Sequence, residues 1–184
     1  MGSGATSACS GGSSYACYDY SPTAVSSCLA YGFAAFNSGS CGTCYQLTFT
    51  GTASHGGGKG AAAIKGKQMI VQAVNIGGIQ ANQFDIMIPG GGVGANPNTC
   101  GNEWKLSTSQ LGATYGGFLT TCGQQSTDYA TQESCVTTAC STLPSGLQAG
   151  CKWLVDWFQA ADNPDVVYQQ VQCPSAITQI SGLQ

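Results

Sequence analysis

Alternating and continuous runs of hydrophobic positions predict several short strands in this chain. Residues 45–50 alternate aromatic or aliphatic side chains with polar ones, as a strand with one buried face does. Residues 69–74 and 84–88 are apolar runs of strand length, and residues 166–171 predict a closing strand. Many short strands joined by long connections indicate an all-β barrel.

One helix is predicted before the first of these strands. Ser21 can act as its N-cap and Pro22 can take its first position, with Gly32 ending it. Other connections contain many glycine, threonine or polar residues and are predicted as loops. These loops are residues 51–66, 99–121 and 122–140, and the segment 1–8 is expected to be irregular or a tag remnant.

Composition narrows the class of protein. The 184 residues predict one domain, and only 7% are charged, with a net charge of -3. Such a chain has no basic surface for nucleic acid or for anionic lipid, and no apolar run long enough to span a membrane. Low charge with 27 glycines suits a loop-rich extracellular protein that binds a neutral polar ligand such as a polysaccharide. We expect no membrane or nucleic-acid partner.

Eleven cysteines indicate disulfides formed in an oxidising compartment, so a secreted protein is expected. Cys41 and Cys44 have the spacing of a zinc knuckle, which is the alternative interpretation. A second knuckle and a nearby histidine are both missing from the sequence. No metal or cofactor is therefore predicted.

The most informative stretch is NQFDIMIPGGGVG, residues 82–94. It places Asp85 among Phe84, Ile86 and Ile88, immediately before a glycine-rich turn that lets another segment approach closely. Apolar surroundings favour the protonated form of a carboxyl group, which a general acid needs. The alternative is a structural aspartate beside a turn.

This stretch and nine further blocks resemble glycoside hydrolase family 45, in its fungal and protist subfamily. The similarity extends from about residue 9 to residue 174. The nine blocks are SPTAV (21–25), YGFAA (31–35), CYQLTFT (44–50), GKQMIVQ (66–72), TYGG (114–117), GCKW (150–153), DWF (156–158), ADNP (161–164) and QVQCP (170–174).

The resemblance implies a six-stranded double-psi β-barrel with long disulfide-bonded loops and a few short helices. It implies an endo-β-1,4-glucanase that hydrolyses cellulose or soluble β-1,4-glucan with inversion, with Asp85 as general acid. Inversion needs a second group that activates water. In the subfamily this base belongs to a Tyr-Trp-Asp-Cys-Cys motif in an N-terminal segment, which has no counterpart in this sequence.

Other groups must therefore be considered as base or accessory residue. Asp19 and Glu103 are the acidic candidates, although Asp19 also suits a helix cap. Asn75 and Asn82 are candidates because another branch of the family is thought to use an amide. Two family positions also differ here, since Gln83 replaces a histidine near the acid and Ile79 replaces a loop carboxylate.

Aromatic residues supply the candidate sugar contacts. Tyr115 matches a family tyrosine that stacks on a sugar ring, and Trp104 could extend the same platform. Simple packing is the alternative for both. Trp153 and Trp157 are better explained as core residues, and His55 as a solvated side chain.

The resemblance also implies disulfides Cys44–Cys173 and Cys140–Cys151, and Cys122 is expected to pair with Cys135 across an apparent insertion. Cys28 matches no family cysteine. For the remaining four we expect re-pairing as Cys9–Cys17 and Cys41–Cys100.

Two rival functions remain open from sequence. A non-hydrolytic, expansin-like glucan-binding or wall-loosening barrel would retain an Asp-bearing strand without the base. A truncated, inactive hydrolase would need its N-terminal segment supplied in trans. The preferred hypothesis is a secreted, monomeric catalytic barrel over residues 1–184, without a carbohydrate-binding module.

Overall fold

A mixed six-stranded sheet forms the centre of the fold. The computed structural model describes residues 9, 20–55, 60–76, 80–94, 97–126 and 128–183. Within them the strand order is β1-β2-β4-β3-β6, and β5 pairs with β2 outside this path. The strands are β1 Thr23–Ala24, β2 Leu29–Ala35, β3 Cys44–Phe49, β4 Gln68–Asn75, β5 Asp85–Ile86 and β6 Val166–Val171.

The sheet mixes parallel and antiparallel pairs. β2 runs parallel to β4, whereas β3 is antiparallel to both β4 and β6. Both β1 and β5 are antiparallel to β2. The strand β1 pairs with residues 30–31 of β2, and β5 pairs with residues 34–35. The segment that carries Asp85 is therefore attached to a strand that is itself held in the middle of the sheet.

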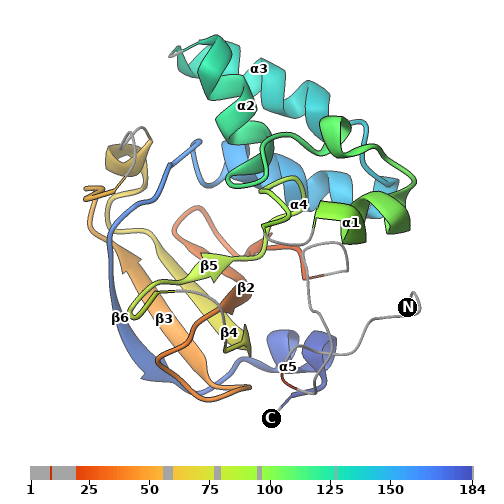
Figure 1. The fold of residues 1–184 in the computed structure, drawn as a ribbon. Coiled ribbons are helices and arrows are strands. Elements are labelled where there is room, and N and C mark those ends of the chain that lie inside the picture. Colours follow the sequence, from red (N-terminus) through yellow and green to blue (C-terminus); the bar gives the residue numbers. More distant parts are fainter. Residues whose placement is uncertain are drawn as a thin grey trace.

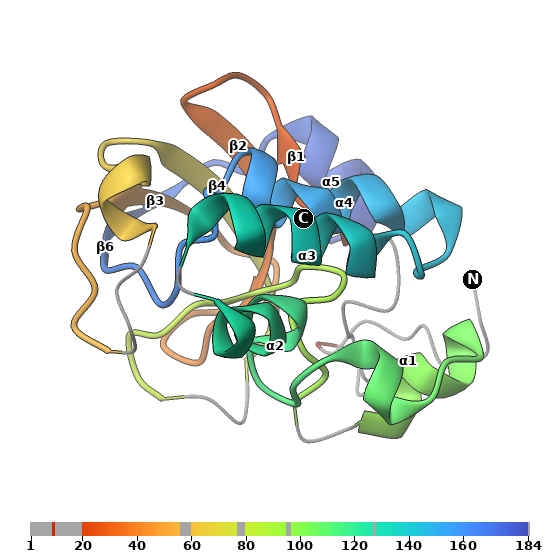
Figure 2. The same ribbon diagram turned by 90° about the horizontal axis from the view of Figure 1, so that it is seen from above.

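Helices cover one side of the sheet, and the last helix lies at the opposite end (Figures 1 and 2). They are more extensive than the few short helices expected from sequence, since α3 and α4 have 12 residues each. None of the helices in the described part of the chain is long and apolar enough to cross a membrane. The helices are α1 Pro97–Trp104, α2 Gly117–Gln125, α3 Tyr129–Cys140, α4 Ser145–Asp156 and α5 Ser175–Ser181, with 3-10 turns η2 Ala61–Ile64 and η3 Thr108–Leu111.

The prediction of loops over residues 99–121 and 122–140 is wrong, because α1, η3, α2 and α3 occupy most of these stretches. The buried side of α3 consists of Gln132, Val136 and Cys140, spaced four residues apart. Only one of these is an aliphatic side chain, so the helical period is hidden from a count of hydrophobic residues. Asp128 caps the helix by accepting a hydrogen bond from the Thr131 amide, at 3.0 Å.

The helix predicted from Ser21 and Pro22 is also wrong. The chain instead forms a β-hairpin, in which Val25 N–H donates to Leu29 O at 2.8 Å. Residues Leu29 to Ala35 then pair with β4 along their whole length, and Phe33 is buried. Tertiary pairing and burial outweigh the local signal for a helix start.

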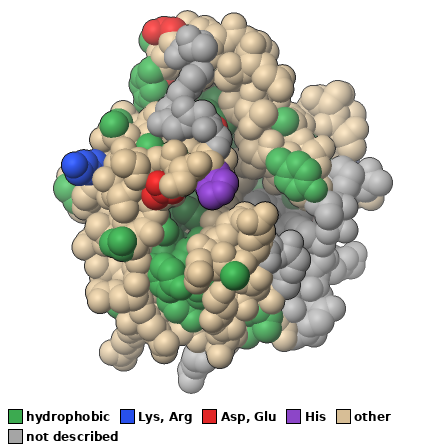
Figure 3. Space-filling model, turned by 60° about the vertical axis from the view of Figure 1, so that its left-hand side comes forward, with side chains coloured by type: hydrophobic (Ala, Val, Ile, Leu, Met, Phe, Trp, Pro, Cys, Tyr) green, Lys and Arg blue, Asp and Glu red, His purple; other side chains and the backbone are tan. Residues whose placement is uncertain are grey.

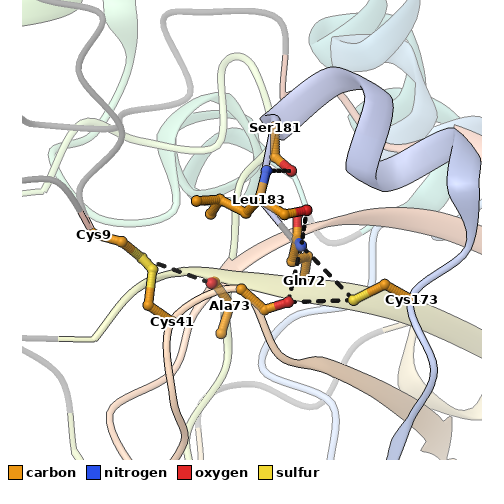
Figure 4. Close-up of a disulfide and its surroundings, with 8 residues drawn as sticks. Cys9, Cys41, Gln72, Ala73, Cys173, Ser181 and Leu183 are labelled. Carbon is orange, nitrogen blue, oxygen red and sulfur yellow. Dashed lines mark hydrogen bonds between the residues drawn. A yellow bond between two sulfur atoms is a disulfide. The ribbon is translucent and has the colours of Figure 1, made fainter.

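Disulfides join distant elements. Cys44–Cys173, Cys122–Cys135 and Cys140–Cys151 are all present. Cys9 bonds to Cys41, which overturns the expected pairs Cys9–Cys17 and Cys41–Cys100. Cys41 lies beside β4, where the sulfur of Cys9 is 3.9 Å from Ala73 O (Figure 4).

The remaining cysteines fall into three groups. Cys100 is disulfide-bonded, and Cys28 is an exposed free thiol. Cys17 lies outside the described residues, as do Asp19, Ile79 and the segment 1–8. The zinc alternative fails, because the sulfurs of Cys41 and Cys44 are both in disulfides.

A buried glutamine connects the end of the chain to the sheet. Gln72 lies in β4 and is fully buried. Its Nε2 donates to Gly42 O at 2.9 Å and to Leu183 O at 3.4 Å (Figure 4). Because a buried amide is stabilising only when it is hydrogen-bonded, these contacts hold the residues after α5 against β4.

Candidate active site

Asp85 begins β5, and its neighbours fix its backbone on both sides. It lies in register with Ala35 of β2, and Met87 N–H donates to Phe33 O at 2.8 Å. Ile86 packs against the main core, and Met87 is buried in a second hydrophobic cluster. The carboxyl group itself is exposed. The sequence had suggested that apolar neighbours enclose the carboxyl group. In the structure they anchor the strand instead.

Gln83 contacts the Asp85 carboxyl group directly. Its Nε2 donates to Asp85 Oδ1 at 2.5 Å, and both side chains are exposed. A glutamine amide donates this hydrogen bond without carrying a charge. The amide therefore orients the exposed carboxyl group through its Oδ1 atom.

Phe84 lies between Gln83 and Asp85 in the sequence and holds this segment against the sheet. Its ring stacks on Phe36 with 4.0 Å between centroids and an interplanar angle of 8°. Figure 3 looks onto the β6 side of the molecule and shows hydrophobic side chains gathered in a hollow of this face. Phe84 and Ile86 are half-buried, so Asp85 lies next to apolar surface that remains partly accessible.

The glycine-rich turn after Asp85 is bound to the turn that carries Tyr115. Phe118 N–H donates to Gly90 O at 2.9 Å, and Gly92 forms a bridge with Tyr115. Gly92 has φ 110°, and a Cβ there would lie 2.8 Å from Thr114 O. The glycine is thus required for the close approach of the two turns. Tyr115 itself is 74% exposed, so its ring is free to contact a ligand.

Trp104 has a different environment. It is the last residue of α1, is half-buried, and packs against the main core and the small cluster around Leu111. This favours packing over the platform role proposed from sequence. Glu103 is exposed on the same helix, which packs against η3.

The two candidate asparagines occupy distinct positions. Asn75 ends β4, is half-buried and, like Asp85, lies in register with Ala35. Asn82 precedes Asp85 by three residues, and its Oδ1 accepts a hydrogen bond from Tyr168 Oη at 2.9 Å. The remaining candidate, Asp19, is outside the described residues.

Tyr168 was missed from sequence. It lies on β6 and is 40% exposed, although the strand was predicted only as a closing element. An aromatic residue in a strand otherwise occupied by valine and glutamine was the available signal. Across the described residues, no group of three or more His, Cys, Asp and Glu side chains could hold a metal ion.

Comparison with known proteins assigns the family. The profile of glycosyl hydrolase family 45 matches residues 2–184. The chain therefore belongs to glycosyl hydrolase family 45. It is 48% identical over 188 residues to Endoglucanase B of Cellvibrio japonicus (strain Ueda107), with 96% of this chain aligned, and it spans 37% of that protein's length.

Two further comparisons concern one springtail. The Endoglucanase of Cryptopygus antarcticus is 40% identical over 182 residues, covering 95% of this chain and 68% of that protein. The crystal structure of the cellulase from this Antarctic springtail superposes with a TM-score of 0.69 at 38% identity, covering 95% of this chain and 74% of the other. Fold and sequence thus agree on the same family.

Proposed function

We propose that this chain is a secreted endo-β-1,4-glucanase that hydrolyses internal bonds of cellulose or soluble β-1,4-glucan with inversion of configuration. The observation that carries the proposal is the exposed carboxyl group of Asp85, held by Gln83 on a strand fixed in the sheet. In this role Asp85 donates its proton to the leaving glycosidic oxygen. Family 45 membership and the endoglucanase names of the relatives support the substrate.

We infer that Asn75 orients the attacking water, because of its position relative to Asp85. Residues directly opposite one another in neighbouring strands point to the same face of a sheet. Asn75 and Asp85 both face Ala35, from opposite sides of β2. Adjacent strands lie about 4.8 Å apart, so the two backbones are about 10 Å apart, which leaves room for a sugar and a water.

Tyr115 is proposed to contact a sugar ring. Its exposed side chain is attached to the turn after Asp85 through the bridge to Gly92. An aromatic face suits the apolar C–H surface of a pyranose. A linear glucan lying across Asp85 would then reach this ring.

The wider architecture is proposed on the same grounds. The mixed sheet, with β5 beside β2 and a parallel β2–β4 pair, supports the double-psi β-barrel that the resemblance implies. We infer one catalytic domain over residues 1–184 that acts as a monomer outside the cell, where its four described disulfides are stable.

The test compares the parent protein with Asp85→Asn and with Asp156→Asn, which removes an exposed carboxylate at the end of α4. Viscosity loss and reducing ends are measured on soluble β-1,4-glucan. A steep viscosity loss per bond cleaved in the parent and in Asp156→Asn, but not in Asp85→Asn, supports endo-hydrolysis by Asp85. Proton NMR of the first product should show the α-anomer, as inversion requires.

A glucan-binding barrel is the second candidate, because Gln83, which hydrogen-bonds to Asp85 in the described part of the chain, is a neutral amide and does not act as a base. In that case the parent would release no reducing ends but would still bind insoluble cellulose. Binding without hydrolysis would replace the enzyme proposal with the binding one.

A further inference from the structure

Tyr168 of β6 reaches the segment that carries the acid. Its hydroxyl donates to Asn82 Oδ1 at 2.9 Å, although the two residues are 86 positions apart. β6 is joined to β3 across the sheet, whereas β5 pairs with β2. This hydrogen bond therefore connects two parts of the sheet that no strand pairing connects directly.

Asn82 needs this support because of its backbone. It has φ 59°, in the left-handed region that asparagine tolerates better than most residues. Its N–H donates to Ser38 Oγ at 3.2 Å. With the side chain bound to Tyr168 and the amide bound to Ser38, Asn82 is fixed from two directions.

The Tyr168 ring holds the next part of the same segment. It meets Phe84 edge to face at 5.1 Å, and it meets Phe36 in the same way at 5.4 Å. Because Phe84 also stacks on Phe36, the Phe84 ring is held between a β6 residue and a residue that follows β2. Asp85 is the next residue along the chain.

We propose that Tyr168 is a positioning residue for Asp85, acting through Asn82 and Phe84; this rests on the proposed role of Asp85 as the acid. Residues 82–84 form the end of an exposed loop that leads into β5, and β5 itself has only two residues. The pairing of β5 with β2 covers only two residues, so the contacts made by residues 82–84 add to the support of Asp85. Displacement of a reacting group by about 1 Å costs up to about a hundredfold in rate.

The inference also assigns Asn82 a role. Its side-chain oxygen accepts a hydrogen bond from the Tyr168 hydroxyl, so Asn82 supports Asp85 instead of activating water. Tyr168 does not touch Asp85 or the glycosidic bond in this account. It differs from Gln83, which contacts the carboxyl group itself.

The experiment compares Tyr168→Phe with Tyr129→Phe. Both remove one hydroxyl and keep the ring, and Tyr129 Oη donates to Val155 O at the same distance, 2.9 Å, in the helical layer. On soluble β-1,4-glucan we expect kcat to fall about tenfold in Tyr168→Phe with KM unchanged, and neither to change in Tyr129→Phe. Equal kcat in Tyr168→Phe and the parent, or equal losses in both variants, would overturn the proposal.

A double variant tests the route. Asn82→Gly keeps the left-handed backbone accessible and removes the acceptor. Combined with Tyr168→Phe, it should lower kcat no further than the more damaging single change, because both act on one hydrogen bond. Losses that multiply would show that Tyr168 acts elsewhere.

Amide hydrogen exchange separates this proposal from the proposed function. Exchange at residues 83–87 should be faster in Tyr168→Phe than in the parent and unchanged in Tyr129→Phe. If the parent hydrolyses no glucan, the enzyme proposal fails, and exchange still decides whether Tyr168 holds the segment. Unchanged exchange in Tyr168→Phe would overturn the positioning role even in an active enzyme.

Discussion

Asn75 and Asp85 lie in register with the same residue, Ala35, from opposite sides of β2. One ends a long internal strand and the other begins a strand of two residues. A β-bulge in the β2–β4 ladder, between Ala34 and Ala35, adjusts the register just before Asn75. Bulges frequently direct a side chain next to an active site.

Removing the Asn75 amide is predicted to remove water activation. Asn75→Ala should lower kcat on soluble β-1,4-glucan by about a hundredfold, the loss expected when the attacking water is no longer held in position. Asn102→Ala, on the exposed side of α1, is the matched control and should retain parent activity. Parent-like kcat in Asn75→Ala would transfer the role to another group.

Gln83 is predicted to orient the acid through its amide. Gln83→Leu leaves the Asp85 carboxyl group without this donor and should lower kcat by about tenfold, because the hydrogen bond strengthens as the carboxyl group loses its proton in the transition state. Gln83→His retains a donor and should recover most of the loss. Gln124→Leu, at an exposed position of α2, is the control for added hydrophobic surface. Failure of the histidine variant to exceed the leucine variant would contradict the account.

Tyr115 is predicted to act in binding rather than in chemistry. Tyr115→Ala should raise KM about tenfold and change kcat little, because an exposed stacking ring contributes about 0.5–1.5 kcal/mol beyond its buried area. Tyr115→Phe should match the parent, since the ring face carries the interaction. A fall in kcat at unchanged KM would mean that the Tyr115 turn serves the reacting centre instead.

Asp165 gives a prediction for stability against pH. The Ser54 backbone amide, at 3.0 Å, is the main cause of a lowered Asp165 pKa, followed by the Ser54 and Thr52 hydroxyls and the charge of His55. A carboxyl group with a lowered pKa stabilises the fold above its unfolded value, about 3.9, and loses that contribution as pH falls through the folded value. Figure 3, which looks onto the β6 side of the molecule, shows the histidine beside an acidic side chain.

The Tm difference between the parent and Asp165→Asn should therefore be largest near pH 5–7 and shrink below about pH 4. Thermal unfolding followed by circular dichroism measures it. Glu103→Gln removes an exposed charge from α1 and should show no comparable dependence. A difference that is constant from pH 3 to pH 7 would contradict the assignment to Asp165.

The sequence predicted the parts of this protein whose signal is local. Strands β3, β4 and β6 follow the hydrophobic pattern closely, and the block around Asp85 indicated the family. The helix expected from Ser21 to Gly32 failed because its start pairs with β2 and its end pairs with β4. The helix α3 was missed because its buried side contains Gln132 and Cys140. The first error arises from a partner that is distant in sequence, and the second from a buried helix side with few aliphatic residues.

The same limit applied to the site. Gln83 lies two residues from Asp85, so its proximity could be predicted. Tyr168 contacts Asn82 and Phe84 from a strand far away in the sequence, and the register shared by Asn75 and Asp85 comes from sheet pairing. No local pattern reports either relationship. The Cys9–Cys41 pair was misassigned for the same reason.

The general-acid role of Asp85 is tested most directly by a substrate that needs no acid. The dinitrophenyl leaving group of an aryl β-cello-oligosaccharide departs without protonation, whereas the sugar leaving group of a glucan must be protonated. We predict that Asp85→Asn loses about a thousandfold in kcat/KM on soluble β-1,4-glucan but less than about tenfold on the aryl substrate. Equal losses on both substrates, or parent activity on the glucan, would contradict the assignment of Asp85 as the acid.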